Sequence, residues 1–121
     1  MRLLYVEDNR INALLFEEAL KPHTWVELRV AYDGGEALAA APQWRPDVLV
    51  LDSHLPDTSG TELLAQLRAV PGLADVPAFM CSADAMPEEV ERGLAAGFVG
   101  YWTKPIDFDA VLADLRRVGA T

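Results

Sequence analysis

The stretch Val48-Leu49-Val50-Leu51-Asp52 is the clearest guide to the fold of this chain. A continuous apolar run of this length, closed by a polar residue, is typical of a strand buried on both faces of a parallel sheet. Comparable runs occupy residues 3–6, 78–81 and 99–102, and the alternating segment 26–30 suits a half-exposed edge strand. The sequence therefore predicts five strands.

Apolar residues at helical spacing fill the segments between and after these runs. The four stripes are Ile11, Leu14, Leu15 and Ala19; Leu63, Leu64, Leu67 and Val70; Val90, Leu94 and Gly97; and Phe108, Val111, Leu112, Leu115 and Val118. Pro87 suits the first turn of the third striped helix, and Asp107 suits the N-cap of the last. A short alanine-rich segment, 36–41, supplies a fifth helix. Strand and helix thus alternate five times, which predicts an α/β fold with a parallel sheet.

Length and composition restrict the function classes. A chain of 121 residues and 13.2 kDa suits one domain spanning residues 1–121, since most domains hold roughly 100–150 residues. The formal charge of −9 disfavours binding to nucleic acid or anionic membranes. The single cysteine, Cys81, excludes an internal disulfide and a cysteine-rich zinc site. No apolar stretch reaches the ~18 residues of a membrane span, and the N-terminus lacks a signal-peptide pattern, so we expect a cytoplasmic protein.

Polar side chains stand where the apolar runs end. Glu7 and Asp8 follow the first run, and Asp52 closes the central one. Ser82 follows the next run, and Lys104 comes shortly after the last. Right-handed crossovers place the carboxyl ends of parallel strands at one edge of the sheet, where ligands bind at the switch point in strand order. We therefore expect three carboxylates, a hydroxyl and an ammonium group on one small surface.

The chemistry of this set favours phosphoryl transfer at a hard cation. Clustered carboxylates repel one another, and a site with few carboxylates that shares a phosphate suits Mg²⁺, whereas Ca²⁺ requires more ligands. Lys104 can pair with an incoming anion, and Ser82 can donate to a phosphoryl oxygen. Asp52 is the natural nucleophile, because carboxylates form acyl phosphates. Phosphoryl transfer requires mainly positioning and charge neutralisation, which these residues supply.

Five motifs in register resemble the receiver domain of two-component response regulators. They are Val6-Glu7-Asp8-Asn9, Val48-Leu49-Val50-Leu51-Asp52, Leu55-Pro56-Asp57-Thr58-Ser59-Gly60, Cys81-Ser82-Ala83 and Tyr101-Trp102-Thr103-Lys104-Pro105. The resemblance covers essentially the whole chain. It implies a flavodoxin-like (βα)5 fold, a doubly wound parallel sheet with strand order 2-1-3-4-5. It also implies a signalling phosphoacceptor and not an enzyme, apart from assisting its own phosphoryl transfer and autodephosphorylation.

The resemblance assigns the phosphoacceptor and the metal ligands. Asp52 matches the phosphoacceptor. Asp8 matches a direct ligand of Mg²⁺, Glu7 matches an acid that acts through water, and the backbone carbonyl of His54 matches the third protein ligand. Mg²⁺ is accordingly the expected cofactor.

The resemblance also assigns the residues that respond to phosphorylation. Ser82 matches the hydroxyl residue that bonds the phosphoryl group, and Lys104 matches the lysine that pairs with it. Tyr101 matches the aromatic residue that turns inward on activation, so Ser82 and Tyr101 form the expected switch. His54 and Asp84 occupy the two positions that tune dephosphorylation. The family often has a cis peptide bond after this lysine, and we expect one here.

Protein partners are implied on both sides of the reaction. A histidine kinase or a histidine phosphotransfer protein is the expected phosphodonor. Phosphorylation is expected to reshape the surface of the fourth helix, fifth strand and fifth helix, which would bind a downstream protein and is a candidate homodimer interface. We expect residues 1–121 to hold the receiver domain without an output domain. Both a stand-alone regulator and the receiver segment of a larger hybrid kinase or regulator fit the sequence.

Two other function classes remain as alternatives. A flavodoxin-like cofactor-binding module requires a phosphate loop rich in Ser, Thr or Gly after the first strand, whereas this chain has Glu7-Asp8-Asn9-Arg10 there. A dinucleotide-binding module requires a glycine-rich motif that is absent from the same place. A phosphorylation-independent pseudo-receiver is the second alternative, and the intact acidic site argues against it.

Several of these residues also have purely structural interpretations. Asp8 or Asn9 suits the N-cap of the first helix, a role that can coexist with metal binding. The two histidines, His23 and His54, have no spacing typical of metal ligands, and His23 is expected in a surface loop. Cys81 is expected to be a small, inert, buried residue in a strand.

Overall fold

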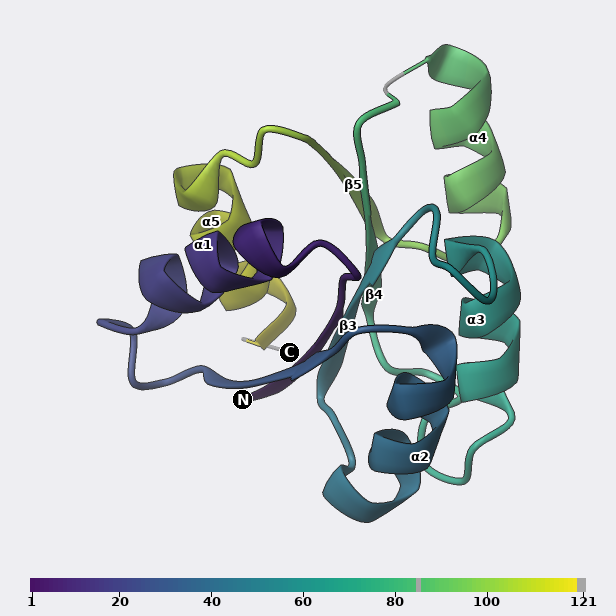
Figure 1. The fold of residues 1–121 in the computed structure, drawn as a ribbon, viewed down its shortest axis with the longest axis horizontal. Coiled ribbons are helices and arrows are strands. Elements are labelled where there is room, and N and C mark those ends of the chain that lie inside the picture. The colour runs from purple at the N-terminus through teal and green to yellow at the C-terminus, as the bar shows by residue number, and fades with distance from the viewer. Residues whose placement is uncertain (85, 120–121) are drawn as a thin grey trace.

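A computed structural model describes residues 1–84 and 86–119, in which five strands alternate with five helices (Figure 1). The strands are β1 (Arg2–Val6), β2 (Glu27–Ala31), β3 (Val48–Asp52), β4 (Ala78–Ser82) and β5 (Gly100–Thr103). The helices are α1 (Arg10–Leu20), α2 (Gly34–Trp44), α3 (Gly60–Arg68), α4 (Pro87–Ala95) and α5 (Phe108–Gly119). Each predicted strand and helix is therefore confirmed, with small shifts of its ends.

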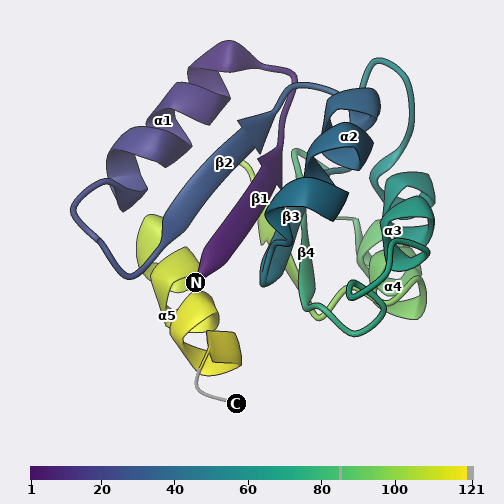
Figure 2. The ribbon, with the colours of Figure 1, turned by 90° about the horizontal axis from the view of Figure 1, so that it is seen from below.

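All five strands run parallel in one sheet, in the order β2-β1-β3-β4-β5. Helices α1 and α5 cover one face, and α2, α3 and α4 cover the other, as Figures 1 and 2 show. The predicted doubly wound, flavodoxin-like fold is thereby confirmed. The strand order changes direction between β1 and β3, which makes the carboxyl ends of these two strands the switch point.

Successive strand residues point to opposite faces of the sheet and build two apolar layers. On β1, Leu4 belongs to the layer under α2, α3 and α4, whereas Leu3 and Tyr5 belong to the layer under α1 and α5. The central strands β1, β3 and β4 are almost wholly buried, while β2 is half-exposed, as expected of an edge strand. This alternation decides on which face each site residue lies.

Short polar side chains begin most of the helices. Asn9 accepts hydrogen bonds from the backbone N–H groups of the first turn of α1, and Asp33 and Ser59 do the same for α2 and α3. Asp107 Oδ1 accepts from the backbone N–H groups of Asp109 and Ala110, which confirms the predicted cap of α5. Pro87 lies in the first turn of α4, as predicted. The sequence therefore specifies most helix starts locally.

The buried face of α1 differs from the predicted stripe. The buried residues are Ala13, Phe16 and Leu20. The predicted residues Ile11, Leu14 and Leu15 are instead 71%, 55% and 56% exposed, and Ala19 is half-buried. Apolar side chains occur on both sides of this helix, so spacing alone does not decide its orientation. The aromatic ring of Phe16 decides it by packing against the buried Tyr5 ring of β1 and the half-buried Phe108 ring of α5.

The predicted stripe of α4 is also wrong in part. Leu94 is 51% exposed and Val90 is half-buried, while Gly97 lies after the end of the helix with a φ of 109°. The buried residue of α4 is Gly93, which lies beside the Tyr101 ring. A glycine contact lets this helix approach the sheet without a large apolar side chain between them. By contrast, the stripes of α3 and α5 are confirmed, with every named residue buried or half-buried.

Two smaller predictions concern single features. The peptide bond between Lys104 and Pro105 is cis, as predicted. Among the described residues, no helix combines the length and the apolar character that crossing a membrane requires.

Candidate functional site

The three predicted carboxylates lie together at the switch point. Glu7, Asp8 and Asp52 each place one carboxylate oxygen within 4.8 Å of the others. Glu7 is fully buried and Asp52 is 6% exposed, whereas Asp8 faces solvent. They line an open pocket whose other walls include His54, Ser82 and Lys104. The structure therefore brings these six predicted site residues to one surface.

Lys104 closes the acidic cluster from the end of β5. Its ammonium Nζ lies 2.7 Å from Glu7 Oε1 and 3.0 Å from Asp52 Oδ2. Only 20% of the lysine side chain is exposed. Burial acts to lower the pKa of Lys104, but the paired carboxylates Glu7 and Asp52 more than offset this, and the pKa is raised. The lysine therefore stays charged and neutralises part of the cluster.

The surroundings of Glu7 disfavour its charged form. Burial raises its pKa, and the neighbouring Asp52 carboxylate raises it further, while Lys104 opposes the shift. Two like charges held close together out of water are costly, so a cation that reaches them gains a large electrostatic advantage. This is the physical reason to expect a metal here.

The loop after β3 supplies further contacts to the phosphoacceptor candidate. The backbone N–H of His54 donates to Asp52 Oδ1 (3.1 Å), so both carboxylate oxygens of Asp52 are engaged. Asp57, later in this loop, accepts hydrogen bonds from the backbone N–H groups of Gly34 and Gly35 at the start of α2 (2.9 and 3.0 Å). These two bonds tie the loop that carries the His54 carbonyl to a neighbouring helix.

Ser82 is held by two donors. Its Oγ accepts hydrogen bonds from the Ser53 hydroxyl (2.8 Å) and the backbone N–H of Asp84 (3.0 Å), and the residue is 1% exposed. Since both lone pairs of its oxygen are used, the Ser82 hydroxyl proton is left to donate. Ser53 was not singled out from the sequence; its place directly after Asp52 is the signal that could have found it.

Tyr101 already contacts the loop after β4. Its hydroxyl donates to the backbone carbonyl of Asp84 (2.6 Å), and its ring is half-buried. Tyr101 and Ser82 belong to rows of side chains that face the α4 side of the sheet, whereas Glu7, Asp52 and Lys104 continue the rows facing α1 and α5. Ser82 therefore lines the pocket from its α4 side, and Tyr101 lies on that same side of the sheet.

Tyr5 lies directly beneath the cluster and was missed by sequence reasoning. It is fully buried two residues before Glu7 on β1, and its hydroxyl donates to Glu7 Oε1 (3.2 Å). Burial, with the nearby Cys81 and Glu7, raises the pKa of Tyr5. The available signal was a polar atom inside an otherwise apolar run, on the same face of the strand as Glu7.

The remaining candidates have structural surroundings. Cys81 is buried, and burial raises the pKa of its thiol to about 12, as expected of an inert residue. His23 lies in the loop before β2, half-buried and edge-on to the Trp25 ring. Trp102 is buried and stacks on Phe79 (ring centroids 4.5 Å apart).

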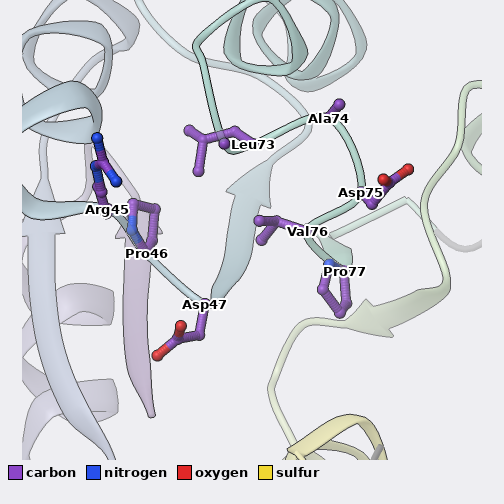
Figure 3. Close-up of a pocket in the computed structure, with 9 residues that line it drawn as sticks. Arg45, Pro46, Asp47, Leu73, Ala74, Asp75, Val76 and Pro77 are labelled. Carbon is purple, nitrogen blue, oxygen red and sulfur yellow. The ribbon is translucent and has the colours of Figure 1, made fainter.

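A second hollow lies at the opposite edge of the sheet, where β3 and β4 begin (Figure 3). Its charged side chains are Arg45, Asp47 and Asp75, and all three are exposed. Exposed side chains of opposite charge are solvated by water and do not form a reactive site. The acidic pocket at the carboxyl ends of the strands is therefore the candidate site.

Comparison with known proteins identifies the family. The model of the response regulator receiver domain matches residues 3–116. The chain belongs to the response regulator receiver family. It is a receiver domain of two-component signalling systems, a family that includes receiver domains of sensor kinases as well as of regulators.

Three relatives illustrate the range of similarity. The probable transcriptional regulatory protein TcrX of Mycobacterium tuberculosis is 40% identical over 98% of this chain, which covers 51% of TcrX. The polar-differentiation response regulator DivK of Brucella anthropi is 34% identical over 94% of this chain and 92% of its own. The receiver domain of the Pseudomonas aeruginosa sensor histidine kinase PA1611, solved with magnesium in its active-site cleft, has a TM-score of 0.86 at 28% identity over 98% of this chain and 97% of its own. The chain thus spans about half the length of the transcriptional regulator and nearly all of DivK.

Proposed function

We propose that this receiver domain accepts a phosphoryl group on Asp52 from a phosphohistidine of a partner protein, with Mg²⁺ bound beside it. The observation that carries the proposal is the buried pair of carboxylates, Glu7 and Asp52, closed by Lys104 at 2.7 and 3.0 Å. Burying such a group of charges costs folding free energy. A phosphate that arrives with a divalent cation gives each charge a partner, since the cation pairs with the carboxylates and the phosphate pairs with Lys104.

The donor set fits Mg²⁺. Three carboxylate oxygens come within 4.8 Å of one another, and oxygen ligands suit a hard cation that keeps some of its waters. Asp8 and Asp52 would bind the ion directly, Glu7 would act through water, and the His54 carbonyl would be the third protein ligand. When bound, Mg²⁺ neutralises charge on the transferring phosphoryl group.

The chain's own residues perform the transfer. An oxygen of Asp52 attacks phosphorus, the bond from phosphorus to the donor imidazole nitrogen breaks, and the imidazole leaves with that electron pair. Lys104 shifts from the carboxylates towards the new phosphoryl oxygens, and Ser82 donates its hydroxyl proton to one of them. The domain thereby assists its own modification and its own dephosphorylation, and it turns over no other substrate.

Labelling by a small phosphodonor tests the acceptor. Wild-type protein incubated with acetyl phosphate and Mg²⁺ is expected to gain the mass of one phosphoryl group, and Asp52→Asn is expected to gain none. Asp75→Asn is the matched control, because Asp75 is an exposed aspartate at the far edge of the sheet. Retained labelling of Asp52→Asn would refute the assignment, and loss of labelling in both variants would point to a general fold defect.

The face beside the site suits the phosphodonor. The side chains of Ile11, Leu14 and Leu15 are exposed on α1, the helix whose Asn12 lines the pocket, and Leu15 also lines a small apolar hollow that shares Lys104 with the acidic site. Large exposed apolar patches mark interaction surfaces. Because this patch adjoins Lys104, we assign it to the histidine kinase or histidine phosphotransfer protein that presents the phosphohistidine.

Two leucine variants test this docking face. Leu14→Glu is expected to slow transfer from a phosphorylated histidine phosphotransfer protein by tenfold or more (about 1.4 kcal/mol), while labelling by acetyl phosphate stays unchanged. Leu94→Glu on α4 is the matched control, since Leu94 is 51% exposed and Leu14 is 55% exposed. Equal slowing by both variants would contradict a docking face on α1.

The output surface is proposed at α4, β5 and α5. Apolar side chains are exposed here at Leu94 and Val99, and Tyr101 links this surface to the loop that holds Ser82. A shift of Ser82 towards a phosphoryl group would change what Tyr101 contacts and so alter this surface for a downstream protein or a second copy. His54 and Asp84 flank the pocket, where they would tune the lifetime of the phosphorylated form.

The wider context is also a proposal. Residues 1–121 form the receiver unit of a cytoplasmic signalling protein, either a stand-alone regulator or part of a longer chain such as a hybrid kinase. Relatives of both kinds match, since DivK is covered over 92% of its length and the sensor histidine kinase AruS over 12%.

A further inference from the structure

The buried Glu7 carboxylate has an unequal distribution of donors on its two oxygens. Oε1 accepts from Lys104 Nζ (2.7 Å) and from the Tyr5 hydroxyl (3.2 Å). Oε2 accepts from the backbone N–H of Asn9 (3.3 Å). Lys104 and Tyr5 therefore share one oxygen, and only one of these two donors is also required by the phosphoryl group.

We propose that Tyr5 is a positioning residue for phosphoryl capture: its hydroxyl remains on Glu7 Oε1 when Lys104 leaves that oxygen for the phosphoryl group. The inference rests on the proposed function and goes beyond it, because it assigns a role to a residue that does not itself line the pocket. Tyr5 acts through Glu7 and Lys104.

The energetic reason is the burial of Glu7. A fully buried carboxylate oxygen that loses its donors carries the whole desolvation penalty of that group. If Lys104 were the sole donor to Oε1, its departure would leave that oxygen unpaired. With the Tyr5 hydroxyl in place, Oε1 keeps one donor, so Lys104 can move at lower cost.

The placement of Tyr5 does not depend on Lys104. Its ring stacks on Phe16 of α1 with centroids 4.1 Å apart, and Phe16 packs in turn on Phe108 of α5. The Tyr5 and Phe16 rings are fully buried within the layer under α1 and α5. The β1 backbone and this aromatic stack therefore hold the hydroxyl under Glu7, wherever the lysine lies.

The experiment deletes the hydroxyl alone. In Tyr5→Phe, the affinity for Mg²⁺ by itself is expected to stay within about twofold of wild type, because the ring and all three carboxylates remain. The affinity for fluoroberyllate, a phosphoryl analogue, at saturating Mg²⁺ is expected to fall about tenfold, the loss of one hydrogen bond to a charged group. Titration calorimetry measures both affinities, and the thermal midpoint checks the fold.

Phe16→Leu is the matched control, because it disturbs the packing of the Tyr5 ring and keeps the hydroxyl. It is expected to lower the thermal midpoint while the ratio of the two affinities stays as in wild type. The proposal is overturned if Tyr5→Phe leaves the fluoroberyllate affinity unchanged, or if it lowers the affinities for fluoroberyllate and Mg²⁺ equally. It is also overturned if Phe16→Leu lowers the fluoroberyllate affinity while leaving the Mg²⁺ affinity unchanged. Failure of the wild-type protein itself to bind fluoroberyllate would instead count against the proposed function.

Discussion

Lys104→Met is the most informative perturbation of the acidic site. The substitution keeps an unbranched side chain of similar length and removes the ammonium that lies 2.7 Å from Glu7 Oε1 and 3.0 Å from Asp52 Oδ2. It leaves two buried carboxylates close together with no cation between them. The free energy of unfolding in the absence of divalent cations is therefore expected to fall.

The magnitude follows from the burial of the three side chains. Removing one partner of a buried ion pair costs about 3–5 kcal/mol. The Lys104 side chain is 20% exposed, and the carboxylate partners are 0% and 9% exposed, so solvent screens the remaining charges slightly and the expected loss is about 2–4 kcal/mol. For a domain of this size the thermal midpoint would fall by roughly 10 °C.

Urea unfolding followed by tryptophan fluorescence measures this loss, since the buried Trp102 stacks on Phe79 and reports on the core. The matched control is Lys21→Met. The Lys21 side chain is 77% exposed and lies 3.9 Å from Glu18, so its removal is expected to change stability by less than about 0.5 kcal/mol. Added Mg²⁺ is expected to narrow the gap between Lys104→Met and wild type, because the ion supplies the missing positive charge.

The reasoning fails if Lys104→Met is as stable as Lys21→Met without divalent cations. It fails equally if the gap between Lys104→Met and wild type stays constant as Mg²⁺ is added, since the loss would then come from packing and not from charge.

Three further predictions concern the metal ligands, Asp57 in the loop after β3, and Gly60 at the start of α3. Glu7→Ala is expected to lower the affinity for Mg²⁺ by about tenfold and Asp8→Ala by more than about 100-fold, because Asp8 is assigned as a direct ligand and Glu7 is not. Titration calorimetry measures both affinities, and equal losses would contradict that assignment. The backbone N–H of Gly34, aided by that of Gly35, holds the pKa of Asp57 below its ordinary value of 3.8. The ionised Asp57 therefore stabilises the fold above pH 3.8, and this stabilisation is lost as the pH falls through the lowered pKa. In urea titrations, the difference in unfolding free energy between wild type and Asp57→Asn should shrink on acidification, and a constant difference would show that Asp57 acts without its charge. Gly60→Ala would place a methyl group 2.6 Å from the Asp52 carbonyl oxygen and is expected to cost about 1–3 kcal/mol of unfolding free energy, whereas an unchanged urea midpoint would mean that the loop moves freely.

Much of the site could be predicted because its reactive side chains lie at or just after the ends of strands. The apolar runs predict strands, and the crossover rule then gathers their carboxyl ends, so the meeting of Asp8, Asp52 and Lys104 follows from residue types and order. Ser53 and Tyr5 escaped this reasoning. Their hydroxyls matter only through contacts to Ser82 and to Glu7, which depend on side-chain directions that no spacing rule gives.

The sequence by itself determined the order of strands and helices, the helix caps and the identity of the acidic site, because each depends on local propensity or on the direction in which strands end. Only the tertiary structure decided which face of α1 is buried and which donors hold each carboxylate oxygen. Helix orientation is a competition among several apolar faces for one sheet, and it is settled by the fit of particular rings such as Phe16 on Tyr5. Hydrogen bonds within the cluster require agreement to a fraction of an ångström between side chains that lie far apart in the chain.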